Sequence, residues 1–313
     1  MKRIISFMLV AILMFTLAPL AIGASVESSD NGELKKARDA AEMVLNKRTI
    51  QNATITVEIE KPLVLNQAPE LFQAIEGREY DELSQEEKEK MLEIVVASQE
   101  YYNNIISSVS SDTDTDVITP MYFESQLSKA IEAAIYVGFP TLSVSDIAKS
   151  FQNANTARDI GVTYANLMGY TQTWDNPADA YRHFAWNWLN TKDIGANDAR
   201  VFGDYHELAM AAAVDANNQT ALSFDQKVTY GVARAFVIRS NTQGSLSAFN
   251  SQFAADSVMD IYNNSQGRRY ALYNSNPNVG DAFYQAFATD NALIGWTSNV
   301  NSSVRSTAFG YWQ

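Results

Sequence analysis

The stretch DAYRHFAWNW, residues 179–188, predicts a helix whose two faces differ in chemistry. Pro177 suits the first turn of this helix. With about 100° of rotation per residue, one narrow arc contains Asp179, Arg182, His183, Trp186 and Asn190. The opposite side contains Tyr181, Phe184 and Trp188, which are typical of a buried stripe. The stretch therefore predicts a helix that packs through one face and carries acid, base and cation on the other.

The polar face has the spacing of an acid–base site. Asp179 and His183 are four residues apart, so the carboxylate can hold the imidazole and fix its tautomer. Arg182 and Trp186 share that spacing, which suits a cation–π contact. A solvated face is the alternative, although such faces usually carry Lys and Glu. We predict catalytic roles for Asp179, Arg182 and His183 and a binding role for Trp186.

His206, the only other histidine, falls on the apolar face of a helix expected over 196–214. Glu207 lies at the edge of that face, and Asp204 is expected to point away from it. His206-Glu207 begins like a zincin motif, but Met210 stands where the second His is required, which excludes that class. We predict His206 and Glu207 as further catalytic residues, with His183, His206 and Glu207 as candidate metal ligands. A core histidine is the alternative for His206.

A third polar face is expected in residues 257–271. Asp260, Asn263, Asn264 and Arg268 lie on or beside one arc, together with Gly267. Adjacent asparagines are unfavourable inside a helix, which makes sense if their amides bind a ligand, a metal or another helix. We predict Asp260, Asn263, Asn264 and Arg268 as binding residues. A fraying helix end capped by Gly267 is the alternative.

The chain is expected to be mainly α, with an all-helical C-terminal domain after a small acidic α+β N-terminal unit. The N-terminal unit covers 25–107, with helices at 33–48 and 83–106 and a strand at 53–65, where apolar and polar residues alternate. A Ser/Asp/Thr-rich linker covers 108–120, and the helical domain covers 121–313. The helices expected in that domain are 122–137, 143–168, 177–192, 196–214, 224–239, 246–264 and 279–290.

Residues 1–24 are predicted to be a signal peptide. Lys2 and Arg3 precede an apolar run that ends in small residues at 23–25. An uncleaved membrane anchor is the alternative, and no later stretch is apolar enough to span a bilayer. The absence of cysteine excludes disulfides and thiolate metal sites. These features predict a secreted protein of a Gram-positive-type bacterium.

Composition and net charge limit the kinds of partner that the chain is expected to bind. An apolar fraction of 46% and a charged fraction of 19% are those of a globular protein. The net charge of −13 provides no basic footprint, so nucleic acids and anionic membrane surfaces are disfavoured. An unidentified substrate or a component of the cell envelope is the expected partner.

The three polar stretches together resemble a family of uncharacterised bacterial domains. Its pattern is an Asp-x-x-Arg-His-x-x-Trp helix, a His-Glu helix and an Asn-Asn-x-x-Gly-Arg stretch, and the resemblance covers residues 170–275. Members occur in secreted proteins and at the C-terminal ends of polymorphic toxins and wall-associated proteins. Tyr262 stands where the family often has His. The resemblance implies an all-helical domain, and it implies no established reaction.

Three functions stay open at this point. A secreted hydrolase-like domain would use the His, Asp, Glu and Arg residues, either with a divalent metal or through metal-free acid–base chemistry. A non-catalytic helical module, binding a partner or the cell envelope, would use the same residues as a structural network. The acidic segment 25–107 would, in a third case, inhibit or chaperone the domain that follows it.

Overall fold

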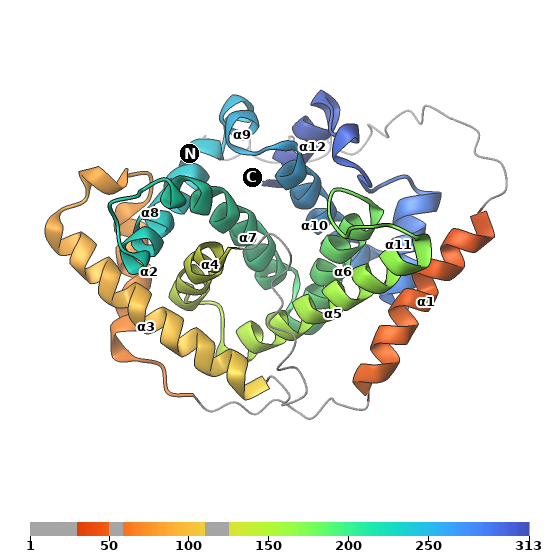
Figure 1. Cartoon of the computed structure of the whole chain (residues 1–313), viewed down its shortest axis with the longest axis horizontal. Helices are drawn as coiled ribbons and strands as arrows, with labels where there is room; N and C mark the ends of the chain where they lie inside the picture. Colours follow the sequence, from red (N-terminus) through yellow and green to blue (C-terminus); the bar gives the residue numbers. More distant parts are fainter. Residues whose placement is uncertain (1–29, 50–58, 110–124, 313) are drawn as a thin grey trace, which may run out of the picture.

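The computed structural model describes residues 30–49, 59–109 and 125–312, and all regular elements in these ranges are helices (Figure 1). The α-helices are α1 (Asp30–Thr49), α2 (Ala68–Ile75), α3 (Gln85–Val109), α4 (Gln126–Gly138), α5 (Val144–Met168), α6 (Pro177–Ile194), α7 (Ala196–Asn217), α8 (Phe224–Thr242), α9 (Leu246–Gln252), α10 (Ala255–Tyr273), α11 (Val279–Tyr284) and α12 (Ser302–Trp312). The expected mainly-α class is confirmed. None of the described helices combines the length and apolar character that a bilayer span requires.

The expected α+β character of the N-terminal unit is wrong for the residues that the structure describes. Residues 53–58 of the expected strand lie outside the described ranges, and Leu63–Gln67 forms a 3-10 turn. Pro62 caps this turn with a φ of −52°, and proline has no N–H to donate to a strand ladder. The expected signal peptide, 1–24, and the expected linker beyond residue 109 also lie outside the described ranges.

The single helix expected over 246–264 is divided into α9 and α10 at Phe253. Phe253 has extended backbone angles and its side chain is buried. Its ring lies 4.9 Å from that of Trp312 and 5.1 Å from that of Phe249, centroid to centroid. Burial of this aromatic side chain between α9 and α12 explains the break, because helix propensity is weak beside tertiary packing. Trp312 belongs to α12, which lies beyond the last helix expected from the sequence, 279–290.

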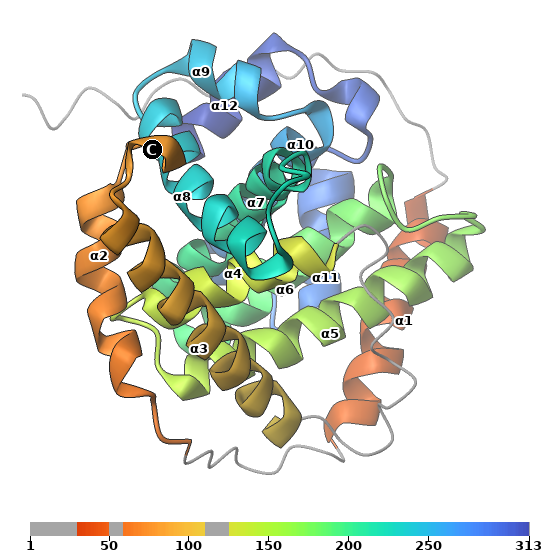
Figure 2. The same cartoon turned by 60° about the vertical axis from the view of Figure 1, so that its left-hand side comes forward.

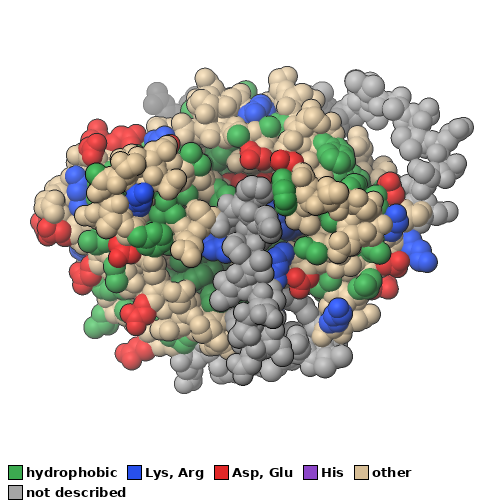
Figure 3. Space-filling model, in the orientation of Figure 1, with side chains coloured by type: hydrophobic (Ala, Val, Ile, Leu, Met, Phe, Trp, Pro, Cys, Tyr) green, Lys and Arg blue, Asp and Glu red, His purple; other side chains and the backbone are tan. Residues whose placement is uncertain are grey.

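α6 lies at the centre of the helical assembly. It packs against α5, α10 and α7, while α4 and α8 lie beyond α7 (Figures 1 and 2). α1 packs against α5 and α11, and α3 packs against α4 and α8, so these two helices occupy opposite flanks in Figure 1. One apolar core cluster includes side chains from α1 and α3 as well as from the central helices. Acidic side chains gather on the flank formed by α3 (Figure 3).

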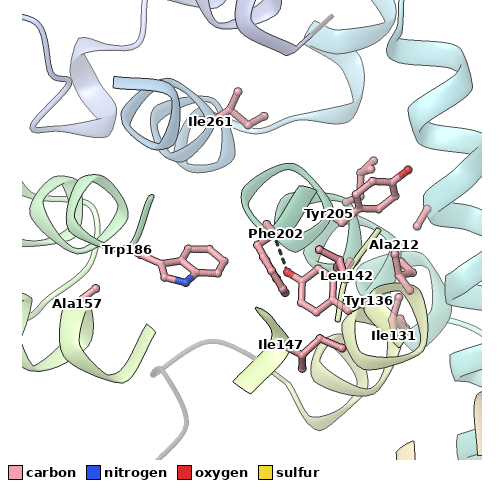
Figure 4. Close-up of a cluster of buried hydrophobic side chains, with 14 of the residues drawn as sticks. Ile131, Tyr136, Leu142, Ile147, Ala157, Trp186, Phe202, Tyr205, Ala212 and Ile261 are labelled. Atoms are coloured by element: carbon pink, nitrogen blue, oxygen red, sulfur yellow. Dashed lines mark hydrogen bonds between the residues drawn. The ribbon is translucent and has the colours of Figure 1, made fainter. Parts of the chain in front are cut away.

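Aromatic packing fixes α4 against α7 (Figure 4). The rings of Tyr136 and Phe202 meet edge to face at 4.6 Å, and the Tyr136 hydroxyl donates a hydrogen bond of 2.8 Å to the Phe202 carbonyl oxygen. Trp186 points from α6 toward the same region. This buried contact places the polar residues of α4 near those of α6 and α7.

Gly267 allows α6 and α10 to approach each other closely. A Cβ atom at this position would lie 2.3 Å from the Phe184 carbonyl oxygen and 3.1 Å from the Asn187 Cβ. The helix continues past Gly267 to Tyr273, so the expected alternative of a fraying end capped by this glycine is wrong. Gly267 serves interhelical packing instead.

We expect Gly267→Ala to lower the free energy of unfolding by about 1–3 kcal/mol, because the added methyl group must separate the two helices. Urea denaturation measures the change. Gly310→Ala is the matched control, since a Cβ there meets no atom within 4 Å and alanine is the better helix former. Equal stability of the Gly267→Ala variant and the unsubstituted chain would contradict the close packing.

Glu87 links the first turn of α3 to the preceding loop through hydrogen bonds. Its carboxylate accepts hydrogen bonds from Arg78 Nη1 (2.6 Å) and Nη2 (3.1 Å) and from the Ser84 backbone N–H (2.7 Å). The Arg78 bond, followed by the Ser84 bond, lowers the pKa of Glu87 to about 2 because both favour the ionised form.

The contribution of Glu87 to stability is therefore expected to vanish in acid. The folded pKa lies below the unfolded value of about 4.3, so the stabilisation is present above the unfolded value and is lost as the pH falls toward 2. Glu87→Gln should lower Tm by about 1–2 °C at pH 6, and the difference should close between pH 5 and 2. The exposed Glu86→Gln variant should show no such pH-dependent gap in thermal melts.

Candidate functional site

His183 is the buried centre of the candidate site, with 1% of its surface exposed. Its Nδ1 atom lies 3.2 Å from Asn264 Oδ1, which also accepts a hydrogen bond of 2.7 Å from Asn187 Nδ2. Because an amide oxygen can only accept, His183 carries its proton on Nδ1. The Nε2 atom therefore presents a lone pair, as in histidines that bind metals.

Two carboxylates and one guanidinium surround that lone pair. Nε2 lies 3.2 Å from Asp260 Oδ1 and 3.7 Å from Asp179 Oδ1, and it also contacts Arg182 Nη2. Arg182 in turn forms a 2.6 Å ion pair with Asp179. The expected face of α6 is thus buried, which excludes the solvated-face alternative.

Asp179, His183 and Asp260 could hold a metal ion. One potential ligand atom from each lies within 4.8 Å of the other two. Two ligand atoms bound to one ion at about 2.1 Å lie about 3.0–3.4 Å apart in octahedral or tetrahedral geometry, close to the two distances from Nε2. The structure therefore places Asp260 in the candidate ligand set, and it brings His206 and Glu207 only to its vicinity.

Three buried polar atoms at this site have no hydrogen-bond partner among the described residues: Asp260 Oδ1, Glu207 Oε1 and Asn264 Nδ2. Asp260 Oδ1 lies 3.2 Å from His183 Nε2 but forms no hydrogen bond with it. Each such atom costs about 1–3 kcal/mol when buried unpaired. Their concentration in one place is typical of a site that binds a polar or charged ligand.

Burial dominates the electrostatics of the site. Desolvation, followed by the positive charge of Arg182, lowers the pKa of His183 well below its usual value. Desolvation raises the pKa of Glu207 to about 8 and that of Asp260 well above its ordinary value, and neighbouring carboxylates add to the shift at Asp260. Acidic groups that resist ionisation together are stabilised by a cation placed among them.

His206 forms the second half of the site. Its ring centroid is 6.2 Å from that of His183, and Trp186 packs edge to face against it at 5.4 Å. Its Nδ1 lies 3.3 Å from Glu132 Oε1, an atom that is also in contact with the Tyr136 hydroxyl oxygen. No sequence signal marked Glu132, because a glutamate within the helix expected over 122–137 looks like an ordinary solvated residue.

A hydrogen bond and an ion pair of Arg268 connect this site to α7. Arg268 Nη1 donates to Asn187 Oδ1 (2.7 Å), and Arg268 Nη2 lies 3.6 Å from Asp204 Oδ1. Asp204 lies on a face of α7 away from His206, and it is paired there with both Arg268 and Arg200. Asn187 was also missed, although its position four residues after His183 places it on the same helical face.

Asn263 stabilises the backbone of a loop beside the site. Its side chain accepts a hydrogen bond from the Ile294 N–H (3.0 Å) and donates one to the Ile294 carbonyl oxygen (2.9 Å). Tyr262, where the resemblance led us to expect His, packs its ring against Tyr311 of α12 at 5.7 Å. The two asparagines therefore have separate roles, with Asn264 bonded to α6 and Asn263 to a loop.

The part of the chain that carries the cluster is covered by a domain whose activity is unknown. The family described as a domain of unknown function (DUF6973) matches residues 141–291, which include Asp179, His183 and Asp260. No curated protein and no solved structure matches the chain. An uncharacterised domain family is thus supported, while the motif pattern and the toxin context stay predictions.

We expect Asn187→Ala to lower the free energy of unfolding by about 2–4 kcal/mol, because it leaves Nη1 of the buried Arg268 without its hydrogen-bond acceptor. Guanidinium chloride denaturation measures the change. Asn166→Ala, at an exposed position of α5, should stay within about 0.5 kcal/mol of the unsubstituted chain. A similar effect of the two substitutions would contradict a stabilising role for the Asn187 bonds.

Proposed function

We propose that this chain is a metal-dependent hydrolase whose metal ion binds Asp179, His183 and Asp260. The observation that carries the proposal is the His183 Nε2 lone pair, which faces the oxygens of two carboxylates. Such groups repel one another unless a cation lies among them. One imidazole and two carboxylates suit zinc or manganese, with positions left for water.

Arg182 supplies positive charge at this position through its contacts with Asp179 and His183. When a metal ion binds, Arg182 would keep its bond to Asp179 and release Nε2. Its guanidinium would then stabilise the anion that develops as a bond is hydrolysed. Arg182 thus fits the catalytic role expected for it.

The reaction class is hydrolysis of a phosphoester, ester or amide. A divalent ion held by Asp179, His183 and Asp260 would supply the hydrolytic nucleophile by lowering the pKa of bound water. His206, held by Glu132, would give a proton to the leaving group, with Glu207 as a second proton carrier. Without a metal, the two histidines and Arg182 would form an acid–base site for the same class of reaction.

A non-catalytic module is the second candidate. The bonds joining Arg268, Asn187 and Asn264 are buried and mutually dependent, as in a network that specifies helix packing. Both candidates bury His183 in this network, so His183→Gln should lower Tm in either case. In a metal-dependent enzyme, chelator should also lower the Tm of the unsubstituted chain, whereas in a structural network it should not. Thermal melts of the unsubstituted chain with and without chelator therefore separate the two candidates.

Metal analysis tests the proposal directly. The purified full chain should contain about one equivalent of divalent metal, and chelator should remove it and lower Tm. Asp260→Asn should abolish binding, because an amide is a poorer ligand than a carboxylate. Asp256→Asn removes the same charge one turn earlier, at an exposed position of α10, and should keep the metal.

The absence of bound metal, together with an unchanged Tm in zinc or manganese, would rule out the metal centre. Loss of metal in both variants would show that general negative charge, and not the cluster, attracts the ion.

We further propose that the enzyme acts outside the cell, on the basis of the predicted signal at residues 1–24. Mass measurement of the chain recovered from the culture medium should show cleavage near Ala24. Retention of the full-length chain in the membrane would favour an uncleaved anchor.

A further inference from the structure

An open groove with a volume of about 480 Å³ lies between α3 and the 3-10 turn Leu63–Gln67. The turn contributes Val64, and α3 contributes the face opposite the one that packs into the core. The residues that line the groove from α3 are Glu89, Leu92, Glu93, Val96, Ala97 and Glu100. The groove therefore lies outside both the proposed metal centre and the matched domain, residues 141–291.

Apolar side chains at this groove are open to solvent. Val96 is 47% exposed, and Leu63, the neighbour of Val64 in the chain, is 82% exposed. Leu92 and Ala97 are half-buried. Apolar residues that are exposed singly are ordinary, but a group that lines one groove is typical of a surface that contacts a partner.

The charged side chains that line the groove are all acidic. No lysine or arginine lines it, and the neighbouring Lys88 lies over the Tyr80 ring instead, 5.0 Å from its centre. Figure 3 shows acidic and apolar side chains together on the flank formed by α3. The exposed carboxylates at the groove are those of Glu89, Glu93 and Glu100. The local electrostatic field therefore favours a cationic partner.

Charge also disfavours an occupant from the protein itself. A second copy of the chain would bring a net charge of −13 and the same glutamates to the groove, and like charges repel. Residues 50–58 and 110–124 contain no lysine or arginine. Beyond the described residues, only Lys2 and Arg3 are basic, and both lie in the predicted signal peptide. The occupant that the charges favour is therefore a different protein.

We propose that this groove binds a basic amphipathic helix of a partner protein. From Glu89 to Glu100, α3 advances about 17 Å, which is about three turns of the partner helix. Apolar side chains of that helix, at intervals of three and four residues, contact Val64, Leu92 and Val96, as in other helix-in-groove complexes. A helix about 10 Å wide and 17 Å long occupies about 1,300 Å³, so only its apolar face enters the groove. Lysine and arginine side chains beside that face pair with the glutamates.

Fluorescence anisotropy of a labelled model peptide, LKKLLKLLKKLLKL, titrated with the full chain tests the proposal. EDTA in the buffer removes bound metal, so the result does not depend on the proposed metal centre. We expect a Kd of about 10 µM at about 50 mM salt and binding at least about fivefold weaker at about 0.5 M salt, where exposed charges are screened. Glu93→Gln/Glu100→Gln should weaken binding about tenfold through loss of two ion pairs. Val96→Thr keeps the shape of the side chain and should weaken binding about threefold through loss of apolar contact.

Glu33→Gln/Glu42→Gln is the matched control, because it removes the same charge from exposed positions of α1, on the opposite flank (Figure 1), and should leave the Kd within about twofold. All the substituted residues are exposed, so Tm should hardly change in any variant.

Equal weakening by the two double variants would overturn the proposal, because it would mean attraction by negative charge alone. Equal binding of a peptide with the same composition, whose leucines are spread around the helix, would overturn it for the same reason. An unchanged anisotropy up to about 1 mM chain would exclude the site. Tighter binding after Lys2→Gln/Arg3→Gln would overturn the proposal as well, because the start of the chain would then be the occupant.

Discussion

The close approach of α6 and α10 at Gly267 is the constraint on which the site depends. Without a side chain at this position, the backbone at Phe184 lies directly against α10. That contact brings His183 within hydrogen-bonding distance of Asn264 and within 3.2 Å of an Asp260 oxygen. A wider separation would remove the acceptor for His183 Nδ1 and leave the tautomer unspecified. The packing of α6 against α10 therefore also determines the geometry of the site.

Helical periodicity predicted much of this arrangement from the sequence. The rotation of about 100° per residue places Asp179 with His183 and Asp260 with Asn264, which is correct because both segments are uninterrupted helices. Periodicity cannot predict which helices meet. Glu132 and Asp204 were therefore missed as partners of His206 and Arg268, since each interaction joins residues more than sixty positions apart.

The errors elsewhere have causes that lie outside the local sequence pattern. The alternating pattern before Pro62 looked like a strand, but a strand needs a partner as well as a pattern, and the described residues 59–67 form none. The break between α9 and α10 depends on Phe253, whose burial against Trp312 involves a residue far along the chain. A short window of sequence does not predict long-range aromatic contacts of this kind.

The position of Glu132 has a consequence for how the functional unit is delimited. Sequence likeness covers residues 141–291, whereas α4 ends at Gly138 and carries both Glu132 and Tyr136. A fragment cut at the edge of the likeness would lose the carboxylate that orients His206 and the phenol in contact with it. The smallest fragment that keeps the whole site is thus longer than the segment that the domain family matches. A chimaera that transfers the site to another protein would have to include α4.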